Sequence, residues 1–244
     1  METLDDILKK IKKTHGEEAK TNFENFRSHL CVLLANQHRG HGVEFQRVPG
    51  SGTTGELNFR NKLFWLKTLP LENGEAFIVL HPEAAGYYEE KKSKYSADLL
   101  GLWRAGKTTR FAVAELKAGK NGDPVLYAVA EGLRNLFFLW QERTKLGALW
   151  MKYMKKCVQD EVVPENVWGR GHPFAEFDMK NLCLLIIGDE SWRKSQSACM
   201  DDVPREVKLG NLNVKVAVYS TPPRAKAQSK PHILLPLRNC IDKG

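Results

Sequence analysis

Cysteine is scarce in this chain, and its few copies are scattered. The 244 residues contain five cysteines, none of which belongs to a Cys-x-x-Cys pair: Cys31, Cys157, Cys183, Cys199 and Cys240. An odd and widely spaced set does not support a disulfide framework, and it lacks the ligand spacing of a zinc site. We therefore expect reduced thiols in an intracellular protein of the cytoplasm.

Long apolar runs are also missing. The first twenty residues, METLDDILKKIKKTHGEEAK, lack the apolar segment of a signal peptide. No later run approaches the roughly 18 apolar residues that a membrane-spanning helix needs. The hydrophobic fraction of 42% and the charged fraction of 27% are ordinary for a globular protein. We expect one soluble domain over residues 1–244 that does not associate with membranes.

Acidic residues are outnumbered by basic ones. The chain has 29 Asp and Glu against 37 Lys and Arg, which gives a formal net charge of +8. Clustered cations supply the sequence-independent part of nucleic-acid affinity. The excess therefore favours an anionic partner, although many basic proteins bind no nucleic acid.

Apolar periodicity predicts the order of helices and strands along the chain. Helices are expected over residues 3–13, 17–37, 124–143 and 145–160. Strands are expected over residues 43–48, 63–69, 76–81, 111–117, 182–187, 214–219 and 233–237. Asp123 and Pro124 are interpreted as the N-cap and the first residue of the third helix. This order indicates an α/β fold.

The segment from Tyr95 to Lys117 allows two exclusive interpretations, of which the first is a metal site. Glu115 and Lys117 end an apolar run that follows Asp98, and on a strand two residues spaced in this way share one face. Two carboxylates from adjacent strands would form an oxygen-lined site for Mg²⁺. A lysine beside them could help to deprotonate a water molecule and offset charge on the phosphorane.

The sequence surroundings of this motif are more informative than the tripeptide itself. The acid-x-Lys tripeptide occurs six times in the chain. The copy at Glu115 differs from the others because it closes an apolar run, follows an acid in a partner strand and leads into a long amphipathic helix. The ordinary alternative is an edge strand that carries a Glu–Lys pair.

The second interpretation is a nucleotide-binding P-loop. Residues 101–108, GLWRAGKT, match the pattern GxxxxGKT, and residues 184–189 resemble an apolar strand that ends in a magnesium-binding acid. A P-loop requires a helix after Thr108, whose first amides would hold the phosphates. The bulky residues 102–104 argue against it because they would crowd those amides. Whether residues 111–117 form a strand or a helix decides between the two interpretations.

The order of elements resembles the restriction-endonuclease-like PD-(D/E)xK nuclease superfamily. A helix, a glycine-rich loop, a hairpin that carries Asp98, a strand that ends in Glu115-Leu116-Lys117, a helix and a buried strand follow one another. Ala97 stands where that motif has proline. The similarity covers a core over residues 17–190, with an inserted hairpin at 55–90 and C-terminal strands at 210–238. It implies a mixed central β-sheet flanked by helices.

The resemblance also implies roles for individual residues. Asp98, Glu115 and the main-chain carbonyl of Leu116 are expected to bind Mg²⁺, for which Mn²⁺ could substitute, and Lys117 is expected to position the water. Many members add a glutamate from the first helix. Here Glu24 is chosen, because it flanks the apolar stripe of that helix, with Glu17 as the fallback.

The resulting expectation is a Mg²⁺-dependent nuclease that hydrolyses phosphodiester bonds, with DNA favoured over RNA and endonucleolytic over exonucleolytic action. Ser51 lies in a loop similar to the glycine–serine loop of archaeal Holliday junction resolvases. Residues expected to contact nucleic acid are Arg47, Ser51, Arg104, Lys107 and Lys120. The alternatives left open are a non-catalytic nucleic-acid-binding protein on the same fold and a P-loop NTPase. A homodimer would suit cleavage of two strands.

Overall fold

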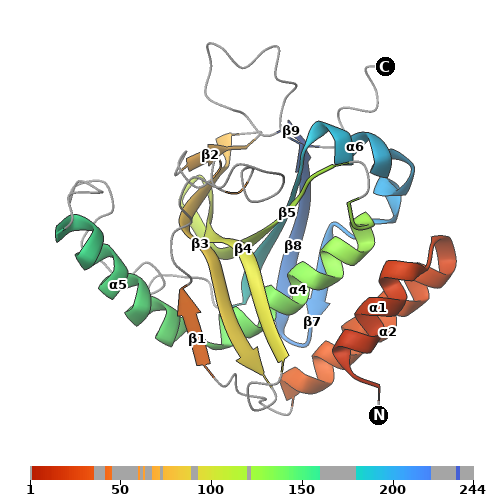
Figure 1. Cartoon of the computed structure of the whole chain (residues 1–244), viewed down its shortest axis with the longest axis horizontal. Coiled ribbons are helices and arrows are strands. Elements are labelled where there is room, and N and C mark those ends of the chain that lie inside the picture. The colour runs from red at the N-terminus through yellow and green to blue at the C-terminus, as the bar shows by residue number, and fades with distance from the viewer. Residues whose placement is uncertain are drawn as a thin grey trace.

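The protein has a mixed α/β architecture, seen in a computed structural model (Figure 1). The structure describes residues 2–35, 42–45, 60, 63, 68–71, 74–88, 93–119, 122–159, 180–220 and 235–236. Within them one β-sheet has the strand order β1-β3-β4-β5-β6-β8-β7, with β2 paired to β3 and β9 paired to β8.

The sheet is antiparallel on one side and partly parallel on the other. Its strands are β1 (Gly42–Phe45), β2 (Thr68–Pro70), β3 (Ala76–Tyr88), β4 (Ser93–Ala105), β5 (Thr108–Lys117), β6 (Asn181–Gly188), β7 (Glu206–Leu209), β8 (Leu212–Ser220) and β9 (Leu235–Pro236). Strands β1, β3, β4 and β5 pair antiparallel, whereas β5, β6 and β8 run parallel. Parallel neighbours need a crossover connection, and here α4 supplies it between β5 and β6.

The helices of the described chain are α1 (Leu4–Lys13), α2 (Gly16–Ala35), α4 (Val125–Gln141), α5 (Arg143–Gln159) and α6 (Glu190–Gln196), followed by the 3₁₀ helix η3 (Ser197–Asp202). Helix α4 packs on one face of the sheet, and α1 and α2 pack against α4 (Figure 1). None of the helices in the described part of the chain is long and apolar enough to cross a bilayer.

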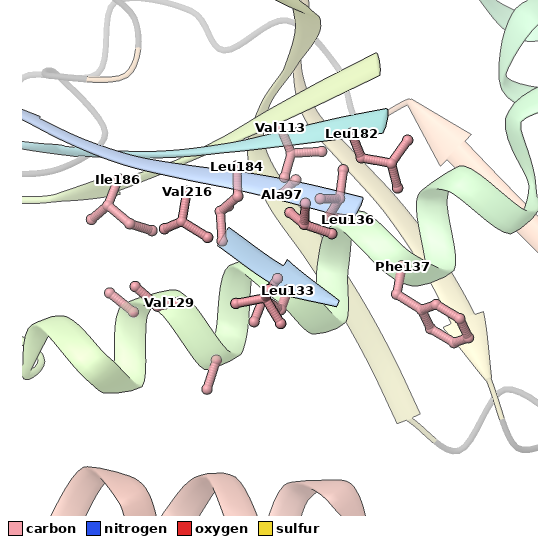
Figure 2. Close-up of a cluster of buried hydrophobic side chains, with 14 of the residues drawn as sticks. Ala97, Val113, Val129, Leu133, Leu136, Phe137, Leu182, Leu184, Ile186 and Val216 are labelled. Carbon is pink, nitrogen blue, oxygen red and sulfur yellow. The ribbon is translucent and has the colours of Figure 1, made fainter. Parts of the chain in front are cut away.

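The main core lies between α4 and the sheet. Figure 2 shows Val129, Leu133 and Leu136 of α4 facing strand residues that include Val113 and Leu184. Each fully buried side chain of this size stabilises the fold by about 1.5–3 kcal/mol relative to an exposed one. Apolar spacing along α4 therefore determines which face of the helix turns toward the sheet.

Strand β5 divides its side chains between two cores. Phe111 and Val113 belong to the core beneath α4, whereas Ala112, Ala114 and Leu116 belong to a second cluster on the other face of the sheet. Because side chains alternate along a strand, Glu115 and Lys117 lie on the side of α4. The strand expected over residues 111–117 is confirmed, and this placement of the two charges follows from it.

Most of the expected elements are present, with some local differences. Leu63, expected to begin a strand over residues 63–69, is helical, and the strand there is β2 over Thr68–Pro70. Asp98 lies inside β4, which begins at Ser93, and not at the start of a strand. Pro124 is the N-cap of α4, and Asp123 does not cap that helix as expected. The α4 amide of Val125 instead donates to Oε1 of Gln196, from the segment after β6, at 3.0 Å. Apolar spacing did not reveal β7 or α6, which are short.

The P-loop interpretation is wrong. Gly101 lies in β4 and Thr108 begins β5, so a strand stands where the phosphate-binding helix would have to be. A Cβ on Gly101 would come within 2.3 Å of the carbonyl oxygen of Ile78 and 2.6 Å of the Phe77 ring. Gly106 has φ +57 in the turn between the two strands. Gly101 therefore allows close packing of β4 on β3, and Gly106 allows the turn between β4 and β5.

Candidate active site

The charged cluster lies where β4 and β5 separate. Their pairing ends at Leu99 and Ala114, while β4 continues toward its start paired with β3. Just beyond this point, Oδ2 of Asp98 accepts a hydrogen bond from the Leu116 amide at 2.8 Å. The carboxylate takes a backbone donor of the neighbouring strand, and so it holds the two strands at a defined separation.

Glu115 projects from β5 into the space beneath α4 and is only 3% exposed. Gly132 permits this close packing, because a Cβ there would lie 2.5 Å from Cδ1 of Leu184 and 3.0 Å from Cγ of Glu115. Burial, together with the charges of Asp98 and Glu131, raises the pKa of Glu115 well above its usual range. Burial therefore disfavours the ionised form of Glu115, and a cation bound beside it would favour that form.

Lys117 lies beside Glu115 and is also buried. Its Nζ donates to Oε2 of Glu131 at 2.9 Å and lies 3.8 Å from Oδ2 of Asp123. Burial opposes the positive charge, but Glu131 and Glu115 outweigh it and raise the pKa of Lys117. The side chain is therefore an ammonium ion at neutral pH. It can donate hydrogen bonds and stabilise negative charge, but it is a poor acceptor for the proton of a water molecule.

Glu131 is a member of the cluster that the sequence interpretation did not include. It comes from α4, where the hydroxyl of Tyr127, one turn earlier, donates to its Oε1 at 3.4 Å. Two polar residues four apart, Glu131 and Asn135, interrupt the sheet-facing side of an otherwise apolar helix. Two polar residues at this spacing, on the helix that follows the acid-x-Lys strand, are the sequence signal that could have identified Glu131 and Asn135 as members of the site.

Glu24 is not part of this cluster, so its expected role is wrong. Its side chain is 58% exposed and pairs with Arg27 on the surface of α2, at 2.6 Å from Nη2. The fallback, Glu17, is even more exposed and pairs with Lys20. Helix α2 packs outside α4, and α4 supplies the acid that the first helix was expected to provide.

The basic residues expected near the substrate are distributed differently. Arg104 and Lys107 are exposed at the turn between β4 and β5. At about 3.3 Å per strand residue, Lys107 lies about 30 Å from Lys117 along β5. Arg104 and Lys107 therefore lie away from the acidic cluster, and their expected contact with nucleic acid stays a prediction. Arg47, Ser51 and Lys120 lie outside the described residues.

A second group of charges borders Asp98 from β3. Nη1 of Arg60 lies 2.7 Å from Oε2 of Glu83 and 3.9 Å from Oδ1 of Asp98. Glu83 stands opposite Asp98 between the Pro82–Leu99 and Ala84–Ala97 pairs. It has φ +51, the one positive φ outside glycine in the described chain. Such backbone strain, about 1–3 kcal/mol, tends to occur at functional sites.

The chemistry of these side chains fits a divalent cation. Burial raises the pKa of Asp98 too, although the Leu116 amide and Lys117 partly oppose it. Asp98 and Glu115 are therefore neighbouring, poorly hydrated carboxylates, the donors that Mg²⁺ and Mn²⁺ prefer. Across the described residues, no three His, Cys, Asp or Glu side chains are already gathered in ligand geometry. Asp98 and Glu115 would hold the ion, with the Leu116 carbonyl as the third expected donor.

Asp189, the acid that a P-loop enzyme would have used for magnesium, has a structural role. Its Oδ1 accepts from the Trp192 amide at 2.7 Å and caps α6, and its Oδ2 accepts from the Gly119 amide at 3.0 Å. Both oxygens are engaged with backbone donors. Asp189 thus ties the end of β6 to the loop after β5.

Comparison of the chain with protein-family models, curated proteins and solved structures found no match. The site consists of a buried carboxylate, Glu115, and a partly exposed one, Asp98, on separating strands, with the Lys117 ammonium ion held next to them by Glu131 of α4. Asp98, Asp123 and Glu131 are each partly open to solvent.

Proposed function

We propose that the protein is a metal-dependent nuclease with a restriction-endonuclease-like core. The observation that carries the proposal is the meeting of Asp98, Glu115 and Lys117 in one cluster where β4 and β5 part. Their burial favours strong electrostatic action on a charged substrate, since solvent screens such interactions less there.

The connectivity of the sheet supports the same proposal. Antiparallel β3, β4 and β5 are followed by the crossover helix α4 and by parallel β6. This order agrees with the elements on which the resemblance to PD-(D/E)xK nucleases rests. The net charge of +8 suits DNA, the substrate that we favour, with internal cleavage preferred over cleavage from an end.

Each residue of the cluster has a defined task in phosphodiester hydrolysis. A bound Mg²⁺ supplies Lewis-acid polarisation of the phosphate and makes a water molecule more acidic. Asp98 and Glu115 hold that ion. The Lys117 ammonium donates to a phosphate oxygen and stabilises the charge that grows on it during attack. Glu131 keeps Lys117 in place and protonated.

Lys12 of α1 is an exposed cation next to this cluster. Its Nζ lies 2.6 Å from Oδ1 of Asp123, the residue whose other oxygen is near Lys117. It also lies 5.0 Å from the centre of the Tyr127 ring. Half of the Lys12 side chain is open to solvent. We assign to Lys12 a contact with the substrate backbone next to the acidic cluster.

Cleavage assays test the proposal directly. Single-stranded, double-stranded and branched DNA and RNA are incubated with Mg²⁺, with Mn²⁺ or with EDTA. We expect metal-dependent cleavage that Asp98→Asn abolishes, with circular dichroism showing an intact fold. Glu24→Gln, an exposed acid, is the matched control and should cleave normally. Full cleavage by Asp98→Asn and by Lys117→Met would overturn the proposal.

A second candidate is a nucleic-acid-binding protein without turnover. It is favoured by the absence, in the described chain, of three acids already arranged as ligands. Salt-sensitive DNA binding with no cleavage of any substrate in Mg²⁺ or Mn²⁺ would support this candidate over the nuclease.

A further inference from the structure

Asn135 is a buried amide whose hydrogen bonds are fully defined. It is 1% exposed, and its Nδ2 donates to Oε1 of Glu115 at 2.8 Å and to the carbonyl oxygen of Ser96 at 2.8 Å. Its Oδ1 accepts from Nε and Nη2 of Arg134, both at 3.2 Å. A flipped amide would turn its oxygen toward a carboxylate and its NH₂ toward a guanidinium. The network therefore allows one orientation.

Arg134 links this amide to the N-terminal helix. Its Nη1 donates to Oδ1 of Asp5 at 2.9 Å, and its side chain is mostly buried between α1 and α4. Helix α1 is anchored in the same core by its apolar residues, Leu4, Ile7, Leu8 and Ile11. A continuous set of hydrogen bonds thus runs from Asp5 through Arg134 and Asn135 to Glu115.

The choice of a neutral donor has a chemical consequence. A lysine or arginine in this position would pair with Glu115 and cancel its charge, as Lys117 does with Glu131. Asn135 holds Oε1 without supplying a positive charge, so compensation of the ionised Glu115 carboxylate is left to a bound cation. Because Oε1 is held, Oε2 is the oxygen turned to a ligand.

We propose that Asn135, oriented by Arg134, is a positioning residue that sets the Glu115 carboxylate for divalent-cation binding. This inference rests on the proposed nuclease function. Hydrogen-bond partners of metal ligands typically contribute 10–100-fold to metal affinity. Asn135 lies on α4, twenty positions after Glu115. The spacing of the acid-x-Lys motif does not indicate this role.

The test is a double-mutant cycle on Mn²⁺ affinity in the full chain. Free Mn²⁺ is measured by electron paramagnetic resonance, which reports weak as well as tight binding. We expect Asn135→Ala to weaken binding by about 10–100-fold. In the Glu115→Gln background the same change should weaken it less than about twofold, because the group that it positions is gone. Asn22→Ala, which removes a hydrogen bond to Thr14 far from the cluster, is the control.

Arg134→Met provides a second route if Asn135→Ala does not fold. It keeps the length and apolar contacts of the side chain but releases the Asn135 amide, and we expect an affinity loss of about 3–10-fold. Unchanged Mn²⁺ affinity in both variants, or equal losses in both backgrounds, overturns the positioning role while cleavage by the wild type leaves the nuclease intact. A wild type that neither binds Mn²⁺ nor cleaves any substrate removes both proposals.

Discussion

At the closed end of the β4–β5 hairpin the strands are paired up to the turn, whereas at the other end they part just before Asp98. The closed end has exposed cations, Arg104 and Lys107, and glycines that serve the backbone. The open end has buried charges and an interstrand contact made by a side chain. Both ends looked like catalytic motifs in the sequence, but loss of strand pairing leaves room for a site only at the open end.

The difference between the two ends is largely one of solvation. Water screens Lys107, so its charge acts weakly on its surroundings. Lys117 is withdrawn from water and surrounded by Glu131, Glu115 and Asp98, which raise its pKa and hold it charged. The same residue type is therefore a solvated surface charge at one end and a buried, paired charge at the other.

The largest expected effect compares these two lysines. Lys117→Met should lower the rate of metal-dependent cleavage by about 10²–10³-fold, because a fixed donor to the phosphate is lost. Lys107→Met should change it by less than about twofold. Initial rates on a fluorescent DNA substrate, with thermal melts of each variant, measure the contrast. Equal losses in the two variants would contradict the division between the ends.

The next effect concerns glycines at the closed end. Gly101→Ala should lower the free energy of unfolding by about 2–3 kcal/mol, because its Cβ would meet the backbone of β3. Gly106→Ala should cost about 1 kcal/mol, since it meets no atom within 4 Å but keeps a left-handed φ. Urea unfolding of both variants checks the order. A smaller loss for Gly101→Ala than for Gly106→Ala would contradict the packing described here.

Stability against pH distinguishes the buried acid from an exposed one. The pKa of Glu115 is raised by burial, Asp98 and Glu131, so between the unfolded and folded pKa values the folded protein binds more protons. The free energy of unfolding of the metal-free protein should therefore fall as pH rises through that interval. Glu115→Gln removes this loss, and we expect a higher melting temperature than that of the wild type at neutral pH.

Melting in EDTA across pH 4–8 measures this effect. Glu24→Gln, on the exposed face of α2, should follow the wild type at every pH. The added prediction is that Mg²⁺ stabilises the wild type and leaves Glu115→Gln unchanged, since ligand binding to the folded state raises stability. A melting curve of Glu115→Gln that follows the wild type in EDTA at every pH would show that folding does not raise the pKa of this carboxyl group.

The smallest expected effect concerns Lys12, the exposed cation beside the open end of the hairpin. Lys12→Gln should weaken DNA binding a few-fold and lower the slope of log affinity against log salt by about one, as expected for the loss of one phosphate contact. Lys9→Gln, on the same helix but beside Asp6 and not beside the cluster residue Asp123, should leave the slope unchanged. Fluorescence anisotropy with the Asp98→Asn protein measures binding without cleavage. Equal slopes for the two lysine variants would place the DNA elsewhere.

Local pattern was enough for most of the fold. Alternation along residues 111–117 predicted β5, and a continuous apolar run predicted β6. The same alternation placed Glu115 and Lys117 on one face. Asp98 could be chosen because an acid in an apolar strand needs a partner, and the Leu116 amide is that partner.

The sequence alone determined which strand carries Glu115 and Lys117 on one face, because side-chain alternation and apolar patterning are local properties. The tertiary structure decided what surrounds it. The acid beside Lys117 is Glu131 of α4 and not Glu24 of α2, since the crossover from β5 to β6 brings α4 onto this face of the sheet. Arg60 and Glu83 pair with each other next to Asp98, and Asn135 of α4 donates a hydrogen bond to Glu115. These contacts depend on how helices and strands pack against one another. Residue spacing within one strand or helix does not indicate that packing.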